Sequence, residues 1–168
     1  MIEKFKTLFF VKSSLISLYL ALTIPIPFIA TEKLKILAII FFIFGLLLII
    51  NITDDYVNTS DKKISYKTSF ISKFFGKKNW EILWKDIKLI KSLSTSQGSR
   101  VFYFISNKNE SFLVPQRVEN FEKFVSIVED KTKLNINEFS YISPLWTYKL
   151  LTYLSLFMII GEIIALLS

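Results

Sequence analysis

The sequence contains no cysteine and no histidine, and it has only four glycines and four prolines among 168 residues. The missing cysteine excludes disulfides, thiolate nucleophiles and iron–sulfur ligation. The missing histidine excludes the usual zinc sites and histidine acid–base pairs. The sequence also shows no paired carboxylates beside a candidate nucleophile. We therefore expect a protein that is not an enzyme, with no catalytic residue, no metal site and no cofactor.

Charge is scarce as well, and its distribution is uneven. Charged residues make up 21% of the chain and hydrophobic residues 52%, whereas about a quarter of an average soluble domain is charged. Three long stretches carry almost no charge, while residues 54–149 carry most of the 21 basic residues. The net charge of +7 favours an anionic surface, which for a membrane protein is the lipid headgroup layer and not nucleic acid. The composition thus predicts an integral, multi-pass membrane protein with one soluble block.

The three apolar stretches cover residues 13–30, residues 36–52 and the segment from about Leu145 to the C-terminus. Each is long enough to cross a hydrocarbon core of about 30 Å. The link at 31–35 is so short that the first two must form an antiparallel helical hairpin. Two prolines near the end of the first stretch should kink or end its helix. A signal peptide is the competing interpretation of this stretch, but Phe28 stands where a cleavage site needs a small residue.

Lysine and arginine set the expected orientation. The N-terminal tail and the 54–149 block are both more basic than the hairpin loop, which carries two lysines. Because basic loops stay in the cytoplasm, we expect the tail and the block on the cytoplasmic side of a plasma or thylakoid membrane. The C-terminus would then lie on the opposite side.

The soluble block reads as antiparallel strands followed by one amphipathic helix. Alternating apolar residues and turn signals predict strands at 55–59, 63–70, 80–84, 87–93, 100–106 and 110–114. Apolar residues at helical spacing predict a helix over 119–133. We expect the helix to close a bent sheet or open barrel, with a shared core formed by Trp84, Phe102, Phe121, Phe124 and Val128.

At this point the block resembles the bacterial pleckstrin-homology-like (PH-like) domain of small membrane proteins. Residues 82–90 read Ile-Leu-Trp-Lys-Asp-Ile-Lys-Leu-Ile, similar to the apolar-x-Asp-Ile-x-x-Ile pattern of that family, and the helix after a short strand also matches. The resemblance covers roughly residues 54–134. Together with the apolar stretches and the distribution of basic residues, it implies an α+β membrane protein in three parts: a tail and transmembrane hairpin at 1–53, a PH-like cytoplasmic domain at 54–143, and a transmembrane helix at 144–168.

Two further resemblances concern the type of protein. Two helices followed by such a domain look like the layout of a photosystem I assembly factor of cyanobacteria and plastids, although the third helix departs from it. The segments Thr-Ser-Gln-Gly-Ser-Arg at 95–100 and Ser-Pro-Leu-Trp-Thr-Tyr at 143–148 resemble uncharacterised cyanobacterial membrane proteins.

Strands that pair as successive hairpins separate the loops into two groups. The turns at 60–62, 85–86 and 107–109 should lie at the end far from the bilayer, and the connections at 71–79, 95–100 and 115–118 at the near end. The first near connection combines aromatic and basic residues, which suits a headgroup boundary. Its candidate binding residues are Lys73, Phe74, Phe75, Lys77 and Lys78. The alternative is that both phenylalanines pack into the domain core and the lysines are merely solvated.

The other two near connections supply two further candidates for headgroup or partner binding, Arg100 and Arg117. The connection at 95–100 lacks the residues of a phosphate-binding loop. The alternative is a polar hairpin loop in which Gly98 adopts a conformation that other residues avoid. For Arg117 the alternative is an ordinary solvent-exposed side chain.

The third apolar stretch carries an aromatic cluster and one acid. Trp146, Tyr148 and Tyr153 stand at its start, where an aromatic belt marks the membrane interface. Glu162 lies sixteen residues beyond Trp146, about 24 Å along a helix. We expect its carboxylate to snorkel to the far interface, although an acid within the membrane would be functional.

Two functions remain open from the sequence. The first is a membrane-anchored interaction module whose PH-like domain presents a surface to lipid or to another membrane protein or complex, in one version as an assembly or scaffolding factor. The alternative is a small subunit or transport accessory that acts through its transmembrane helices.

Overall fold

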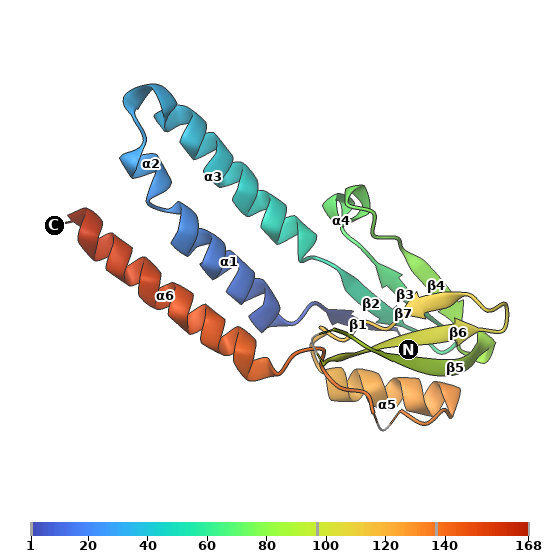
Figure 1. Ribbon diagram of the computed structural model, residues 1–168. Coiled ribbons are helices and arrows are strands. Elements are labelled where there is room, and N and C mark those ends of the chain that lie inside the picture. The colour runs from blue at the N-terminus through green and yellow to red at the C-terminus, as the bar shows by residue number, and fades with distance from the viewer. Residues whose placement is uncertain (1, 97, 137, 168) are drawn as a thin grey trace. The chain divides into compact units, whose positions relative to one another are not determined.

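The computed structural model describes residues 2–96, 98–136 and 138–167, and its chain divides into two compact units (Figure 1). One unit consists of Met1–Leu8 and Asp54–Pro144, and the other of Phe9–Thr53 and Leu145–Ser168. The first is a mixed unit of strands and helices, and the second is entirely helical.

Among its described residues, the mixed unit contains seven strands in two antiparallel sheets. The first sheet has the order β1-β2-β3-β4 and the second the order β5-β6-β7. A single turn of 3-10 helix, η1 (Trp84–Asp86), connects the two sheets. The strand bounds are β1 Glu3–Lys6, β2 Tyr56–Thr59, β3 Lys63–Lys67, β4 Trp80–Leu83, β5 Ile87–Ser94, β6 Arg100–Ser106 and β7 Ser111–Leu113.

Strand β1 comes from the N-terminal tail, which the sequence analysis had grouped with the membrane hairpin. It pairs antiparallel with β2, so that Phe5 lies opposite Val57. Phe5 is buried and its ring meets the ring of Phe124 edge-on at 5.5 Å, while Glu3 forms an ion pair of 2.7 Å with Lys123. Residues 9–53 are therefore an insertion between two paired strands of the mixed unit.

The core of this unit lies between the sheets and helix α5 (Phe121–Thr132), which Figure 1 shows alongside the strands. The apolar side of α5 faces inward, and Phe124 and Val128 are fully buried. Burial of such a face stabilises the helix more than its intrinsic propensity does. The five core residues predicted from the sequence all belong to this cluster, so that prediction is confirmed.

Hydrogen bonds place the turns at two ends of the unit, as the alternation of strands predicts. At one end, Trp84 donates its backbone amide to Lys62 (3.1 Å), and Asn107 donates its own to Asp86 (2.9 Å). At the other end, Gln116 donates its side-chain amide to the Arg100 carbonyl (3.0 Å).

The same second end holds the chain connections to the helical unit. Leu8 donates to the Arg117 carbonyl (2.8 Å), and Thr7 donates to the Asp55 carbonyl (3.2 Å). Three connections of the mixed unit, at 68–79, 95–100 and 115–118, thus share one end with the segments that lead into residues 9–53.

One predicted strand ends earlier than expected. The sequence predicts a strand that reaches Phe70, but β3 ends at Lys67 and Phe70–Phe74 form a short helix, α4. Ser69 caps this helix by accepting a hydrogen bond from the Ser72 amide at 3.1 Å. The alternation of apolar residues did not distinguish the last strand residues from the first helical turn, because a serine cap acts only over one turn.

In the part of the helical unit that the structure describes, three segments are long and apolar enough to cross a membrane: Phe9–Ile29, Glu32–Ile52 and Leu145–Leu167. The first is broken, with α1 ending at Thr23 and α2 covering Ile26–Ile29. The sequence predicted this break from its prolines. The others are α3 (Glu32–Ile52) and α6 (Leu145–Leu167).

Helix α1 contacts both α3 and α6. Tyr19 donates its hydroxyl to the Phe42 carbonyl of α3 at 2.8 Å and stacks on the Phe42 ring. Gly45 allows this approach, because a Cβ atom there would overlap the Tyr19 ring. On the α6 side, Ser13 and Thr152 share a hydrogen bond between their hydroxyls at 3.3 Å.

Candidate functional site

The candidate site is the loop at 68–79, which contains α4 and connects β3 to β4. Its helix begins at the Ser69 cap, and the chain leaves it through Gly76 at a φ of +86°. Glycine adopts this left-handed conformation without the steric penalty that a side chain would bring. A polar cap before the helix and a glycine after it therefore mark the two ends of this short helix.

The aromatic side chains of this loop point to solvent. Phe70 is 82% exposed, Phe74 84% and Phe75 64%. The alternative that Phe74 and Phe75 pack into the domain core is therefore wrong. Three adjacent exposed phenylalanines form an apolar patch of the kind that marks a protein or membrane contact.

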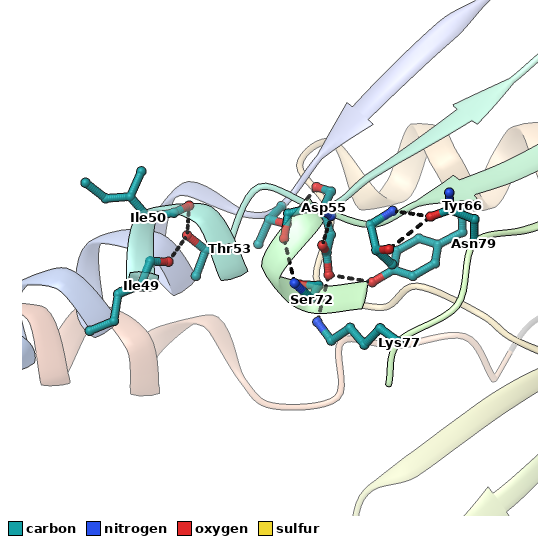
Figure 2. Close-up of polar contacts among 11 residues, drawn as sticks. Ile49, Ile50, Thr53, Asp55, Tyr66, Ser72, Lys77 and Asn79 are labelled. Carbon is teal, nitrogen blue, oxygen red and sulfur yellow. Dashed lines mark hydrogen bonds and ion pairs between the residues drawn. The ribbon is translucent and has the colours of Figure 1, made fainter. Parts of the chain in front are cut away.

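A buried aspartate fixes the loop to the start of β2 (Figure 2). Asp55 accepts hydrogen bonds at Oδ2 from the Lys77 ammonium (2.7 Å) and the Tyr66 hydroxyl (2.8 Å), and at Oδ1 from the Ser69 amide (3.0 Å). Both carboxylate oxygens are thus occupied by donors from the loop and from β3. A charged acceptor with three donors makes hydrogen bonds stronger than neutral pairs do.

The electrostatics of this cluster keep Asp55 ionised and Tyr66 protonated. Burial by itself raises the pKa of Asp55, but the hydrogen bonds from Lys77, Ser69 and Tyr66 outweigh it, and the pKa lies below its usual value. Burial and the neighbouring Asp55 carboxylate raise the pKa of Tyr66 far above its usual range. The tyrosine therefore keeps its proton and acts as a donor.

A second set of hydrogen bonds joins the first and last residues of the loop. Asn79 accepts at Oδ1 from both the amide (2.8 Å) and the hydroxyl (2.9 Å) of Thr68. Together with Asp55, this contact fixes both ends of the 68–79 segment to the sheet. The sequence pattern shows residue 55 only as the start of a predicted strand and does not reveal its role, because the partners of Asp55 lie 11 to 22 residues away.

The predicted basic residues of the loop differ in their surroundings. Lys77 is engaged by Asp55. Lys73 and Lys78 are exposed and, within the described residues, take part in no ion pair. They flank Phe74 and Phe75 in sequence, and Phe70 precedes them. The loop thus combines two exposed cations with three exposed apolar rings.

The two predicted arginines lie at the same end of the unit but make different contacts. Arg100 forms an ion pair with Glu138. Arg117 is exposed. Within the described residues, no hydrogen bond or ion pair joins either arginine to the 68–79 loop. Gly98 adopts a φ of +77° as predicted for a hairpin loop; its neighbour Gln97 lies outside the described residues.

The predicted aromatic anchors lie in the first turns of α6. Trp146 is 63% exposed and Tyr153 64%. The Tyr148 hydroxyl is instead buried and has no hydrogen-bond partner among the described residues. The described residues contain no group of three or more Asp or Glu side chains placed to bind a metal ion.

Comparison with known proteins identifies one related protein. The chain is similar to the uncharacterised protein slr0269 of Synechocystis sp.. The two are 30% identical over 148 residues, which cover 84% of this chain and 74% of that protein. No family model matches the chain. The similarity supports the expected relation to uncharacterised cyanobacterial proteins, and the chain belongs to the same family as slr0269.

Proposed function

We propose that this protein is a membrane-anchored, non-enzymatic interaction module. Its strand-containing unit is a PH-like domain whose 68–79 loop contacts lipid headgroups beside the helices that anchor it. In the more specific version, the domain positions another membrane protein or complex during assembly or as a scaffold. The exposed basic and aromatic surface of α4 is the observation that carries this proposal.

Membrane insertion is supported by the three long apolar helices. In α3, large apolar side chains are exposed along most of the helix, among them Phe41, Phe44 and Leu47. In water such a surface would be costly, at roughly 25 cal/mol for each Å² of apolar area. Hydrocarbon removes that cost, so we propose that all three helices span a bilayer.

A PH-like fold is supported by the arrangement of the mixed unit. Four antiparallel strands, three more antiparallel strands and a following amphipathic helix occur in that order. The sequence alone does not indicate where the helical hairpin joins this unit; the hairpin is inserted between β1 and β2.

The covalent chain supports the position of the loop near the bilayer. Asp55 follows the last residue of α3 by three positions, which limits the distance between them to about 10 Å. Because Asp55 binds Lys77 and Ser69 directly, the loop remains close to the point where α3 ends. A membrane that contains α3 therefore brings its headgroups near α4.

The physical role of the loop would be to orient the domain. Each lysine near an anionic surface contributes about 1 kcal/mol, and burying a phenylalanine contributes about 1.5–3 kcal/mol. Three membrane helices already anchor the chain, so these contributions select an orientation and do not recruit the protein. A fixed orientation is what a scaffold for a membrane complex requires.

Site-directed spin labelling tests this proposal on the full chain in nanodiscs that contain anionic lipid. The natural absence of cysteine allows a single label at Phe74→Cys, with Lys108→Cys as the matched control at the opposite end of the unit. We expect the label at 74 to be accessible to oxygen and shielded from a water-soluble relaxation agent. The label at 108 should show the reverse pattern.

Charge reversal provides the second arm of the experiment. The double variant Lys73→Glu and Lys78→Glu should expose the label at 74 to water, whereas reversal at Lys62 and Lys108 should not change it. Lys77 is left unchanged because its loss would disturb Asp55. If the label at 74 were equally accessible to the water-soluble relaxation agent in anionic and neutral nanodiscs, that result would contradict headgroup binding.

The alternative function, a small subunit or transport accessory, is favoured by one observation in the helical unit. Glu162 of α6 has a buried carboxylate oxygen without a hydrogen-bond partner among the described residues. Placing an acid within a bilayer is costly in free energy. A helix that serves only as an anchor gains nothing from such a group, so its presence favours a function for the helices.

A further inference from the structure

We propose that Glu162, together with the backbone oxygens at the end of α1, forms a binding site for a monovalent alkali cation, with Na⁺ as the best fit. This proposal relies on the membrane insertion proposed above but not on the role of the 68–79 loop.

Glu162 lies inside a long apolar segment of α6. It is the only charged residue between 150 and 167. From the sequence alone, its carboxylate is expected to snorkel into water at the far interface. The structure instead buries Oε2, which has no partner among the described residues. A snorkelling side chain would expose this oxygen, so the group is directed into the protein.

The register of α1 and α6 indicates what Glu162 faces. Ser13 meets Thr152, and the Lys149 ammonium lies 5.1 Å from the centre of the Phe10 ring. Both pairs have the same separation of 139 residues, so the two helices run parallel and in step. The same offset places Glu162 level with Thr23, the last residue of α1.

The packed face of α6 supports this register. Thr152 and Ser155 are the buried residues of this helix, and Glu162 continues their spacing by seven positions beyond Ser155. Residues seven apart lie on the same side of a helix. Glu162 therefore lies on the side of α6 that contacts α1, and Figure 1 shows α1 and α6 alongside each other over this length.

Helix α1 ends at this level because of its prolines. Proline has no N–H, so Pro25 and Pro27 cannot donate to the carbonyls four residues earlier. Those carbonyls belong to Ala21 and Thr23, the last turn of α1. Unsatisfied backbone carbonyls are tolerated in a membrane only where protein or a bound polar group covers them.

The groups gathered at this level are all acceptors. Thr23 donates its hydroxyl proton to the Tyr19 carbonyl at 2.7 Å, which leaves its oxygen free to accept. The described basic residues of the helical unit lie closer to its two ends than Thr23 and Glu162 do. Lys12 and Lys149 lie near the start of α1 and α6, and Lys33 and Lys35 lie at the start of α3. Lys35 is paired with Glu32 at 3.5 Å.

Acceptor oxygens without donors select a hard cation. Carboxylate and carbonyl oxygens are the ligands that alkali and alkaline-earth ions prefer. One carboxylate neutralises one positive charge, so a monovalent ion leaves no net charge within the hydrocarbon, whereas a divalent ion would leave one. Unwound helix ends with free carbonyls coordinate Na⁺ in this way in membrane proteins.

Carbodiimide labelling tests the site in the full-length protein in proteoliposomes. Dicyclohexylcarbodiimide, an apolar reagent that reacts with carboxyl groups inside membranes, is applied at constant pH and ionic strength in NaCl or choline chloride. Mass spectrometry reports labelling at Glu162. We expect at least fivefold slower labelling in NaCl, and no label at this position in Glu162→Gln.

Two variants separate cation binding from a structural role. Pro25→Ala supplies the missing N–H to the Ala21 carbonyl, and we expect it to retain labelling at Glu162 while reducing the protection by Na⁺. Leu156→Ala, an exposed position on α6, is the matched control and should keep full protection.

Each other outcome overturns the proposal. Equal labelling in NaCl and choline chloride would show an acid that binds only a proton, and absent labelling in both would show a carboxylate already engaged by another group. Alkaline carbonate extraction of the same membranes checks insertion separately, so a failure of the membrane proposal is distinguishable from a failure of the site.

Discussion

At the residue scale, Asp55 determines how the loop is held. Its carboxylate is buried and accepts three hydrogen bonds, whereas the phenylalanines that it positions are exposed. Because Lys77 is engaged by Asp55, its charge is not available for a lipid headgroup, but the ion pair fixes the conformation of the loop. A rigid loop loses less conformational entropy when it contacts a surface.

We predict that Asp55→Asn destabilises the mixed unit by about 1–3 kcal/mol, because hydrogen bonds to a charged acceptor are replaced by weaker ones. Thermal unfolding of the full-length protein in mild detergent, followed by tryptophan fluorescence, measures this loss. Glu122→Gln, at an exposed position on α5, is the control and should change stability little.

The same variant should change the response to acid. The pKa of Asp55 is lowered in the folded protein from its usual 3.8, so its contribution is complete at neutral pH. It is lost as the pH falls below 3.8 through the lower folded value, because protonation then favours the unfolded chain. Asp55→Asn should show a smaller loss of stability in that range, and an unchanged acid profile would argue against the role of this carboxylate.

At the element scale, β1 shows that the membrane hairpin interrupts a sheet. The tail residues pair with β2, bury Phe5 and contact α5 through Glu3. A domain defined as residues 54–143 would lack one edge strand of its first sheet and one core ring. The hairpin therefore takes the place of an ordinary turn between two antiparallel strands.

We predict that the fragment 54–144 is less stable than the same fragment joined to residues 2–7 by a short glycine and serine linker of about two to five residues. The difference should be about 3–5 kcal/mol, the usual cost of removing a buried phenylalanine. Urea unfolding monitored by tryptophan fluorescence compares the two. In the joined fragment, Phe5→Ala should remove most of the gain, and equal stability of all three would show that β1 is dispensable.

At the scale of the whole molecule, the β1–β2 pair constrains topology. Strands that share hydrogen bonds lie on the same side of any membrane, so the chain between Lys6 and Tyr56 returns to its starting side. The lysine and arginine distribution independently favours the same arrangement. A hairpin of α1 and α3 satisfies both requirements.

We predict that the hairpin loop at 31–35 and the mixed unit lie on opposite sides of the membrane. Lys33→Cys and Lys108→Cys, each introduced into the natural cysteine-free chain, should react with a membrane-impermeant maleimide from opposite sides of sealed vesicles. The domain side should be cytoplasmic. Reaction of both positions from one side would exclude the hairpin.

The sequence alone determined the apolar segments, the proline break and most of the strands of the block. These features depend on local composition and periodicity, which act over a few residues along the chain. The inward face of α5 was also determined locally, since Phe124 and Val128 follow helical spacing. Exposure of Phe74 and Phe75 was left open, because an apolar residue in a loop has no periodicity that assigns it to a core.

The tertiary structure decided the contacts between segments that are distant in the chain. The tail residues 3–6 are too short a segment to be recognised as a strand until β2 supplies their partners 50 to 56 residues later. Asp55 gains its role from Tyr66 and Lys77, and only the folded chain shows that an oxygen of Glu162 is buried without a hydrogen-bond partner among the described residues. The energy of these polar groups depends on the desolvation and partners that folding creates, and no local pattern encodes either.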